Sequence, residues 1–387
     1  MFPSEDALKL CLNSLQKNQI IVIALNGIYY LATSMTDFGH QNLEKITQKS
    51  SRIEYLFRDQ KQLSEFAIFP DWSSFLLQEI LPNHLTCLLP RKTKQTLQTD
   101  ILENNSKNLR NTFSNSNSLQ NIEQNQNNAK IYCNKTSHCF TQKLLDSLEV
   151  PLLITKASIA GEMPAINLAM LKSYFGENVH YFLPPKYSIT GIGPTLIEAH
   201  SEKLEILEMG ILEKKDFAGF ISVPIEESFR IESSFSLYNQ SKSIILAKNY
   251  IPKKDETVVI IGTKEKIRQT FELNSLNLFG FHHKIYQNKI LINLGSQTNL
   301  ENVARHLSQK IFEARTLGMK IIILDQNWGQ NKWGKIISFY LQKYTETEFN
   351  LETEGRAATI ERIKPKMTII KKIKQSIGKL NPRKAKE

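Results

Sequence analysis

The chain has 387 residues, of which 41% are hydrophobic and 22% charged, and its formal net charge is +11. This length allows two domains with cores of their own, and the composition is ordinary for a soluble globular protein. No apolar run approaches the ~20 residues that cross a bilayer, and the start MFPSEDALKL carries acidic residues where a secretory signal carries basic ones. We therefore expect a cytoplasmic protein.

The positive charge is concentrated at the C-terminal end of the chain. Residues 362–386 contain ten Lys and Arg and no acidic residue, so the rest of the chain is close to neutral. Within residues 351–387 apolar side chains recur at helical spacing, among them Met367, Ile370 and Ile377. This pattern predicts a basic amphipathic tail that binds tRNA or another polyanion; a membrane surface and docking on the chain's own second domain are the alternatives.

Residues 1–212 are expected to form an α/β domain. Its apolar periodicity predicts a helix at residues 6–16, a strand at residues 20–25, a second helix before Lys49 and a second strand at residues 84–90. Residues 97–129 are rich in Asn, Gln and Ser and cannot bury enough apolar surface to offset the entropy of ordering. We expect them to be a disordered insertion inside this domain, after which the α/β pattern resumes.

The most informative part of this domain is residues 150–210. A buried apolar run, PLLIT, leads into the small-residue loop KASIAG, which allows a ligand to approach backbone N–H groups closely between Thr155 and Gly161. A short helix over residues 165–175 and several short strands follow. An ordinary strand-to-helix turn is the alternative interpretation of the same loop.

Residues 213–256 are expected to form a linker and residues 257–350 a small Rossmann-like domain. Three continuous apolar strands, VVIIG, KILINLG and KIIILDQ, alternate with helices, which predicts a parallel sheet covered on both faces. Thr298 and Glu301 have the spacing of a capping box at the start of the long helix. The neighbouring GSQT loop is a candidate phosphate site, although the chain has no GxGxxG and no GKS or GKT motif.

The cysteines indicate a reducing environment. Cys11, Cys87, Cys133 and Cys139 show no CxxC spacing and are expected to be free thiols. Cys133, His138 and Cys139 lie close together in sequence, but no fourth ligand with suitable spacing accompanies them. We therefore predict no structural metal site.

Seven short motifs occur along the chain, and although each is weak by itself, their order is informative. They are ALNGIYYL, QKSSRIEY, PNHLT, TKASIAG, PTLI, LEMG and NYIP. In this order they resemble the YrdC family of threonylcarbamoyl-AMP synthases in its longer, two-domain form. The resemblance implies an α/β fold, with a YrdC-like twisted mixed sheet and its helices followed by a small Rossmann-like C-terminal domain that has a parallel sheet.

The resemblance also implies an activity. Members of this family join L-threonine, bicarbonate and ATP into threonylcarbamoyl-adenylate, which serves the threonylcarbamoyladenosine modification of tRNA. Mg²⁺ is implied beside ATP, and no catalytic residue is assigned. The residues placed on ATP are Lys49, Arg52, Thr86, Ala157 and Tyr250, and those placed on threonine are Tyr29, Thr155 and Thr195.

The chain departs from the family pattern at polar positions. Asn134 and Glu208 stand where the family has arginine, and a glutamate there would repel phosphate. Lys156, in the signature loop, restores one positive charge but lacks the planar fork of arginine. Two hypotheses follow: an active but divergent synthase, or a catalytically degenerate relative that binds RNA or a partner protein.

Overall fold

The structure is a computed structural model, and it describes residues 5–48, 52–80, 84–92, 130–181, 189–229, 244–247, 250–251, 256–272, 283–286, 288–324 and 327–347. The expected insertion at residues 97–129, the basic tail and Lys49 lie outside these described residues. None of the described helices combines the length and the apolar character that crossing a membrane requires.

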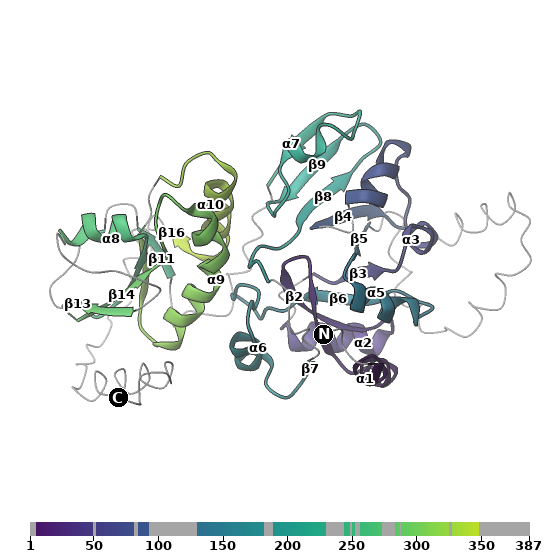
Figure 1. Ribbon diagram of the computed structural model, residues 1–387, viewed down its shortest axis with the longest axis horizontal. Helices are drawn as coiled ribbons and strands as arrows, with labels where there is room; N and C mark the ends of the chain where they lie inside the picture. Colours follow the sequence, from purple (N-terminus) through teal and green to yellow (C-terminus); the bar gives the residue numbers. More distant parts are fainter. Residues whose placement is uncertain are drawn as a thin grey trace, which may run out of the picture.

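The first domain is built on a mixed sheet of ten strands in the order β10-β9-β8-β4-β5-β3-β6-β2-β1-β7 (Figure 1). The central pairs β3–β5 and β4–β8 are parallel, whereas β4–β5, β3–β6 and β2–β6 are antiparallel. This is the twisted mixed sheet that the resemblance implied. The strands are β1 (Ile21–Leu25), β2 (Ile28–Ser34), β3 (Glu54–Phe57), β4 (Leu85–Pro90), β5 (Lys130–Lys135), β6 (Leu152–Lys156), β7 (His180–Tyr181), β8 (Thr195–Ala199), β9 (Leu204–Glu208) and β10 (Ile225–Glu227).

Helices cover both faces of this sheet, but not equally. On one face α2 and α6 pack through Leu43 and Met170, and α3 packs farther along through Leu63. On the other face α1 and α5 cover only β1, β2, β3 and β6, through residues such as Leu15 and Leu144. The helices are α1 (Glu5–Gln16), α2 (Asp37–Ile46), α3 (Gln60–Phe66), a 3₁₀ turn (Asp71–Ser73), a π-helical turn (Leu76–Ile80), α5 (Cys139–Asp146), α6 (Leu168–Phe175) and α7 (Lys214–Phe217).

The second domain contains a six-stranded sheet in the order β13-β14-β12-β15-β11-β16. Its inner strands are parallel, as predicted, while β13 pairs with β14 in the antiparallel sense at the edge. The strands are β11 (Ile244–Ala247), β12 (Val259–Gly262), β13 (His283–Tyr286), β14 (Lys289–Asn293), β15 (Ile321–Leu324) and β16 (Glu346–Thr347), and the helices are α8 (Lys264–Phe271), α9 (Leu300–Thr316) and α10 (Lys332–Tyr344).

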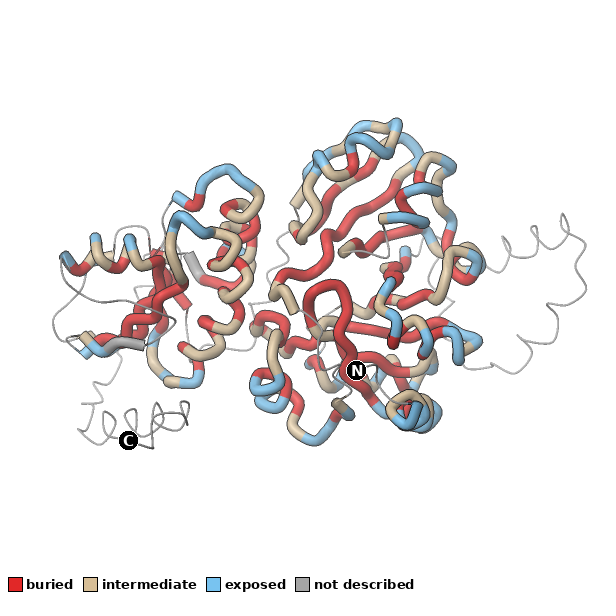
Figure 2. Tube along the Cα trace, viewed as in Figure 1, coloured by how far each residue is buried: buried red, intermediate tan, exposed pale blue. Residues whose placement is uncertain are grey.

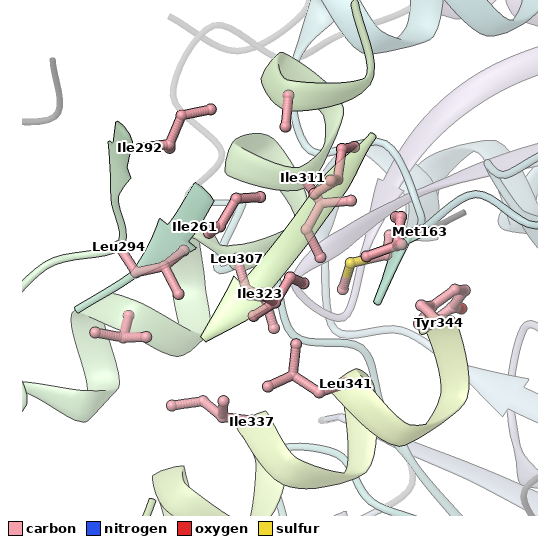
Figure 3. Close-up of a cluster of buried hydrophobic side chains, with 14 of the residues drawn as sticks. Met163, Ile261, Ile292, Leu294, Leu307, Ile311, Ile323, Ile337, Leu341 and Tyr344 are labelled. Carbon is pink, nitrogen blue, oxygen red and sulfur yellow. The ribbon is translucent and has the colours of Figure 1, made fainter. Parts of the chain in front are cut away.

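The continuous apolar strands of this domain are explained by its layers. Ile261 and Ile323 point towards α9 and α10, whereas their neighbours Ile260 and Ile322 point towards α8, so the sheet is buried on both faces (Figures 2 and 3). The predicted capping box of α9 is wrong by one residue. Asn299 caps the helix, because its side chain accepts from the backbone N–H of Asn302 at 3.1 Å.

The range expected to be a linker, residues 213–256, supplies elements to both domains. It carries α7 and β10, which extends the large sheet beside β9, and then β11, which lies between β15 and β16 in the second sheet. Little hydrophobic periodicity marks these strands, because β10 has three residues and β11 has four, which is too few to show a repeat.

The two domains are in direct contact through α9 and α10. Met163 and Ile192 of the first domain belong to the same buried cluster as the second domain's core, and Figure 3 shows Met163 beside that core. Ser308 on α9 donates to the carbonyl of Pro164 at 2.9 Å, and Arg315 donates to the carbonyl of Gly161 at 2.9 Å. The end of the small-residue loop is therefore used to dock α9.

Candidate functional site

Where α1 and α5 end, the large sheet presents a polar cluster. The pairing register, in which Tyr30 lies opposite Lys156, turns side chains from six strands to the same face. A shift of one residue in any strand would turn its polar side chain to the opposite face. Together with Arg52, which precedes β3, the members of this polar cluster are Tyr30, Glu54, Thr86, Asn134, Lys156 and Glu208.

Glu208 is the centre of the polar cluster, because three cations converge on its carboxylate. Arg52 places Nη1 2.9 Å from Oε1 and Nη2 3.0 Å from Oε2, which is a two-pronged contact. Lys156 Nζ lies 3.2 Å from Oε2, and Lys343 Nζ lies 3.0 Å from Oε1. Lys343 is on α10, so this carboxylate joins the two domains across the site.

A second carboxylate, that of Glu54, is completely buried beneath the first. Its Oε1 accepts from Arg52 Nε at 2.9 Å, and its Oε2 accepts from the Thr86 hydroxyl at 3.3 Å and from the Asn134 amide. Asn134 also donates to Thr86 at 2.9 Å and accepts from Asn26 at 3.1 Å. These hydrogen bonds compensate the burial of Glu54 and set the orientation of Arg52.

The pKa shifts show how tightly these charges are coupled. Burial alone would raise the pKa of Glu208, but Lys156, Arg52 and Lys343 hold it well below its usual range. Burial lowers the pKa of Lys156, and although Glu208 opposes this, Arg52 and Lys343 lower it further. When Lys343 of α10 is counted with the polar cluster, three cations face two carboxylates, so the cluster carries one excess positive charge that favours a negatively charged ligand.

Aromatic groups surround the polar cluster. The Arg52 guanidinium lies 5.0 Å from the centre of the Tyr132 ring. From α10, Tyr340 and Tyr344 stack with ring centres 6.2 Å apart. The fully buried hydroxyl of Tyr30 has no hydrogen-bond partner within the described part of the chain, so it is a donor that a ligand could satisfy.

Of the residues expected to bind ATP, the structure brings Arg52 and Thr86 together. The Thr155 hydroxyl donates to the backbone carbonyl of Arg52 at 3.0 Å, but this side chain lies on the face of the sheet opposite to the polar cluster, opposite Leu31 on β2. Ala157 is buried on the opposite face of the sheet, where its N–H donates to the carbonyl of Tyr29 at 2.9 Å.

The other expected residues lie apart from the cluster. The Tyr29 side chain packs on the opposite face with the α2 and α6 residues. The Thr195 hydroxyl donates to the Leu212 carbonyl and accepts from its N–H, both at 2.9 Å. Tyr250 packs in the second domain and donates to Glu256 at 2.8 Å.

Sequence reasoning missed Glu54 and Lys343 as site residues. Glu54 interrupts the apolar strand IEYLF, and an acidic residue at a buried strand position is a signal that could have revealed it. Lys343 carries no local signal, because it lies in the last turn of α10, where a lysine is ordinary. Asn134 and Glu208 were noticed only as departures from a family pattern.

One group of potential metal ligands occurs among the described residues, at the far end of β8 and β9. Ligand atoms of Glu198, His200 and Glu205 lie within 4.8 Å of one another. Lys130 forms an ion pair with Glu198, and Lys203 Nζ lies 3.9 Å from Glu205. Because lysines already balance both carboxylates, we assign no metal to this group.

The candidate phosphate loop of the second domain is also satisfied internally. The Glu265 carboxylate accepts from the Ser296 hydroxyl at 2.7 Å and from the Gln297 N–H at 2.9 Å. A carboxylate of the chain thus takes the donors that a phosphate would use. The polar cluster of the first domain is therefore the stronger candidate site.

A large mixed sheet with a cationic cluster on one face, followed by a Rossmann-like domain in contact with it, defines a YrdC-like protein of the two-domain type. The chain belongs to the Sua5/YciO/YrdC family, whose model, described as telomere recombination, matches residues 13–210. This confirms the family predicted from the short motifs.

Solved structures agree with this assignment. The chain is similar to P. abyssi Sua5 in complex with L-threonine, with a TM-score of 0.62 and 13% identity over 89% of this chain and 96% of that one. A doubly substituted variant of P. abyssi Sua5 gives a TM-score of 0.61 and 13% identity over 89% of this chain and 95% of that one. No curated protein matches the chain. At this identity the likeness shows the fold.

Proposed function

We propose that this chain is a divergent threonylcarbamoyl-AMP synthase acting in the cytoplasm. It would carboxylate L-threonine with bicarbonate and transfer the adenylyl group of ATP to the carbamate, releasing pyrophosphate, to supply the threonylcarbamoyladenosine modification of tRNA. Family membership supports this proposal, as does the likeness to P. abyssi Sua5, whose structure contains L-threonine.

The observation that carries the proposal is the excess positive charge of the polar cluster. In adenylyl transfer the carbamate oxygen attacks the α-phosphorus and pyrophosphate leaves, so the site must hold phosphate charge and position the two reactants. Arg52 offers a planar fork for phosphate oxygens and Lys156 a mobile point charge. The Tyr30 hydroxyl beside them would donate to the same ligand.

The other proposed contacts that lie on described residues require a local change when ligands bind. We keep Tyr29, Thr155 and Thr195 as proposed threonine contacts, and Lys49, Ala157 and Tyr250 as proposed ATP contacts. Thr195 would have to exchange its bonds to Leu212 for bonds to the ligand. Mg²⁺ would arrive on the phosphates of ATP, because cations already occupy both carboxylates of the cluster, and we assign it no residue.

A second candidate function is a non-catalytic one. Glu208 already neutralises most of the charge that a nucleotide would need, and this observation favours a degenerate relative that binds RNA or a partner protein. The basic tail, residues 351–387, would be the tRNA-binding element in either case.

The test combines binding with turnover. Purified protein is titrated with Mg²⁺–ATP and then with L-threonine in a calorimeter, and pyrophosphate release is measured with and without bicarbonate. The proposal expects both ligands to bind and release to require all three substrates. Arg52→Met should abolish ATP binding, while Arg58→Ala, which removes a surface arginine paired with Asp59, should not. If neither substrate binds at millimolar concentration, the synthase proposal is wrong.

A further inference from the structure

Glu208 is held as a bound anion would be held. Each of its oxygens contacts one nitrogen of the Arg52 fork and one lysine, Lys343 at Oε1 and Lys156 at Oε2. A two-pronged guanidinium contact completed by ammonium groups is how proteins bind phosphate and carboxylate ligands. Here the anion is part of the chain.

The backbone at Glu208 is held close to β8. The register between β8 and β9 shifts between Leu196 and Ile197, a bulge that re-aims the end of β9. Two residues later the chain passes so close to β8 that a Cβ on Gly210 would lie 2.3 Å from the backbone of Pro194. These contacts fix the backbone that carries Glu208 beside β8.

An incoming anion and Glu208 must compete, because both need the same donors. The nitrogens of the Arg52 fork already face Glu208, and Nε is used by Glu54. A second anion beside a buried carboxylate would be repelled at short distance. A ligand phosphate can take Arg52 only if Glu208 withdraws, and Lys343 would lose its partner at the same time.

The domain contacts divide into two groups with different fates. The contact between Lys343 and Glu208 lies in the site, whereas Arg315 on Gly161, Ser308 on Pro164 and the burial of Met163 lie along α9. The helix α10 also contacts the first domain through the Tyr340 hydroxyl, which accepts from the Gly193 N–H at 3.4 Å, and through the Phe339 ring, whose centre lies 5.9 Å from that of Phe229. Loss of the first group would leave the second in place. Displacement of Glu208 would therefore remove the Lys343 contact from the last turn of α10, while the contacts of Tyr340 and Phe339 and those of α9 remain.

We infer that Glu208 is a built-in competing anion that determines which ligands enter the site and couples their binding to the loss of the Lys343 contact between the site and α10. A single carboxylate from solution cannot outcompete one that is already in place, whereas a polyphosphate, which has several negative charges, can. The inference rests on the proposed function in that the nucleoside triphosphate is the natural displacing ligand. The inference predicts an order of binding in which the polyphosphate binds before the amino acid.

The experiment uses inorganic tripolyphosphate as the probe, which needs neither a nucleotide pocket nor turnover. Its affinity is measured by calorimetry at constant ionic strength for wild type, Glu208→Gln and the matched control Glu205→Gln, which alters the same strand. Glu208→Gln should bind at least about tenfold more tightly, because the competitor is gone and three cations remain. Glu205→Gln should equal wild type.

A second variant and a second readout keep the inference open to refutation. Glu208→Asp retains the charge with a shorter reach and should give a smaller gain in tripolyphosphate affinity, even if Glu208→Gln folds poorly. Hydrogen exchange in residues 341–344, the last turn of α10, should rise in the wild type on adding tripolyphosphate, and exchange in residues 300–316 should not. If neither variant binds the probe more tightly than wild type, the inference is wrong.

The outcomes also separate this inference from the synthase proposal. If Glu208→Gln gains tripolyphosphate affinity but the wild type releases no pyrophosphate from ATP, the competing anion stands and the synthase proposal fails. If the wild type is an active synthase but Glu208→Gln binds the probe no better, the competing anion fails and the synthase proposal stands.

Discussion

Replacement of Arg52 by methionine is the most direct test of how the polar cluster is held together. Arg52 is the single cation in contact with Glu54 among the described residues, and the Glu54 side chain is 0% exposed. Glu208 would keep Lys156 and Lys343, but Glu54 would keep only neutral hydrogen bonds from Thr86 and Asn134. Arg52→Met therefore destabilises the protein mainly by leaving the buried Glu54 carboxylate without a cation.

The expected loss of stability follows from this difference between Glu54 and Glu208. Removing one partner of a buried ion pair costs about 3–5 kcal/mol in the free energy of unfolding. Arg52 is 19% exposed, so we expect the lower end, about 3 kcal/mol. Adding Glu54→Gln should recover about half of this loss, because the uncompensated charge is then removed and the hydrogen bonds remain. Arg52→Lys should cost about 1–2 kcal/mol, since an ammonium cannot span both carboxylates.

Urea denaturation followed by circular dichroism measures these differences. Arg58→Ala serves as the control, because Arg58 pairs with Asp59 on the surface and such pairs contribute little. The reasoning is refuted if Arg52→Met loses less than about 1 kcal/mol. It is also refuted if Glu54→Gln adds to the loss and does not reduce it.

Three further predictions concern pH and local structure. Because the pKa of Glu208 is held below its usual value, the ionised carboxylate should contribute fully to stability above about pH 4.3 and lose this contribution only at lower pH. The difference in urea unfolding midpoint between wild type and Glu208→Gln should therefore be constant from pH 7 to 5 and shrink at pH 3.5. Gly191→Ala should weaken domain docking by about 1–3 kcal/mol, because Gly191 has φ +77° and a Cβ there would lie 2.3 Å from the Arg305 carbonyl; an unchanged melting temperature would contradict this. Thr195→Val should cost about 1–3 kcal/mol by removing both bonds to Leu212, whereas Thr316→Val, on the surface, should leave the unfolding midpoint unchanged.

The elements that sequence reasoning predicted well are those specified by local pattern. The apolar stripe of α9 and the continuous apolar strands β12, β14 and β15 needed only the spacing of nearby residues, and all were found. The short strands β10 and β11 were not predicted. Each is a few residues long and is stabilised by pairing with a distant strand, which leaves little trace in its own sequence.

For the candidate site, too, local sequence patterns predicted some residues and missed others. The order of short motifs by itself determined the family and pointed to Arg52 and Thr86. Only the tertiary structure decided that Glu208, read from sequence as a repulsive substitution, is the partner of Arg52 and of Lys343, which is 135 residues away along the chain. Which charges meet depends on strand register and on domain docking, and both are set by the sum of many distant contacts, so no local pattern of residues contains the answer.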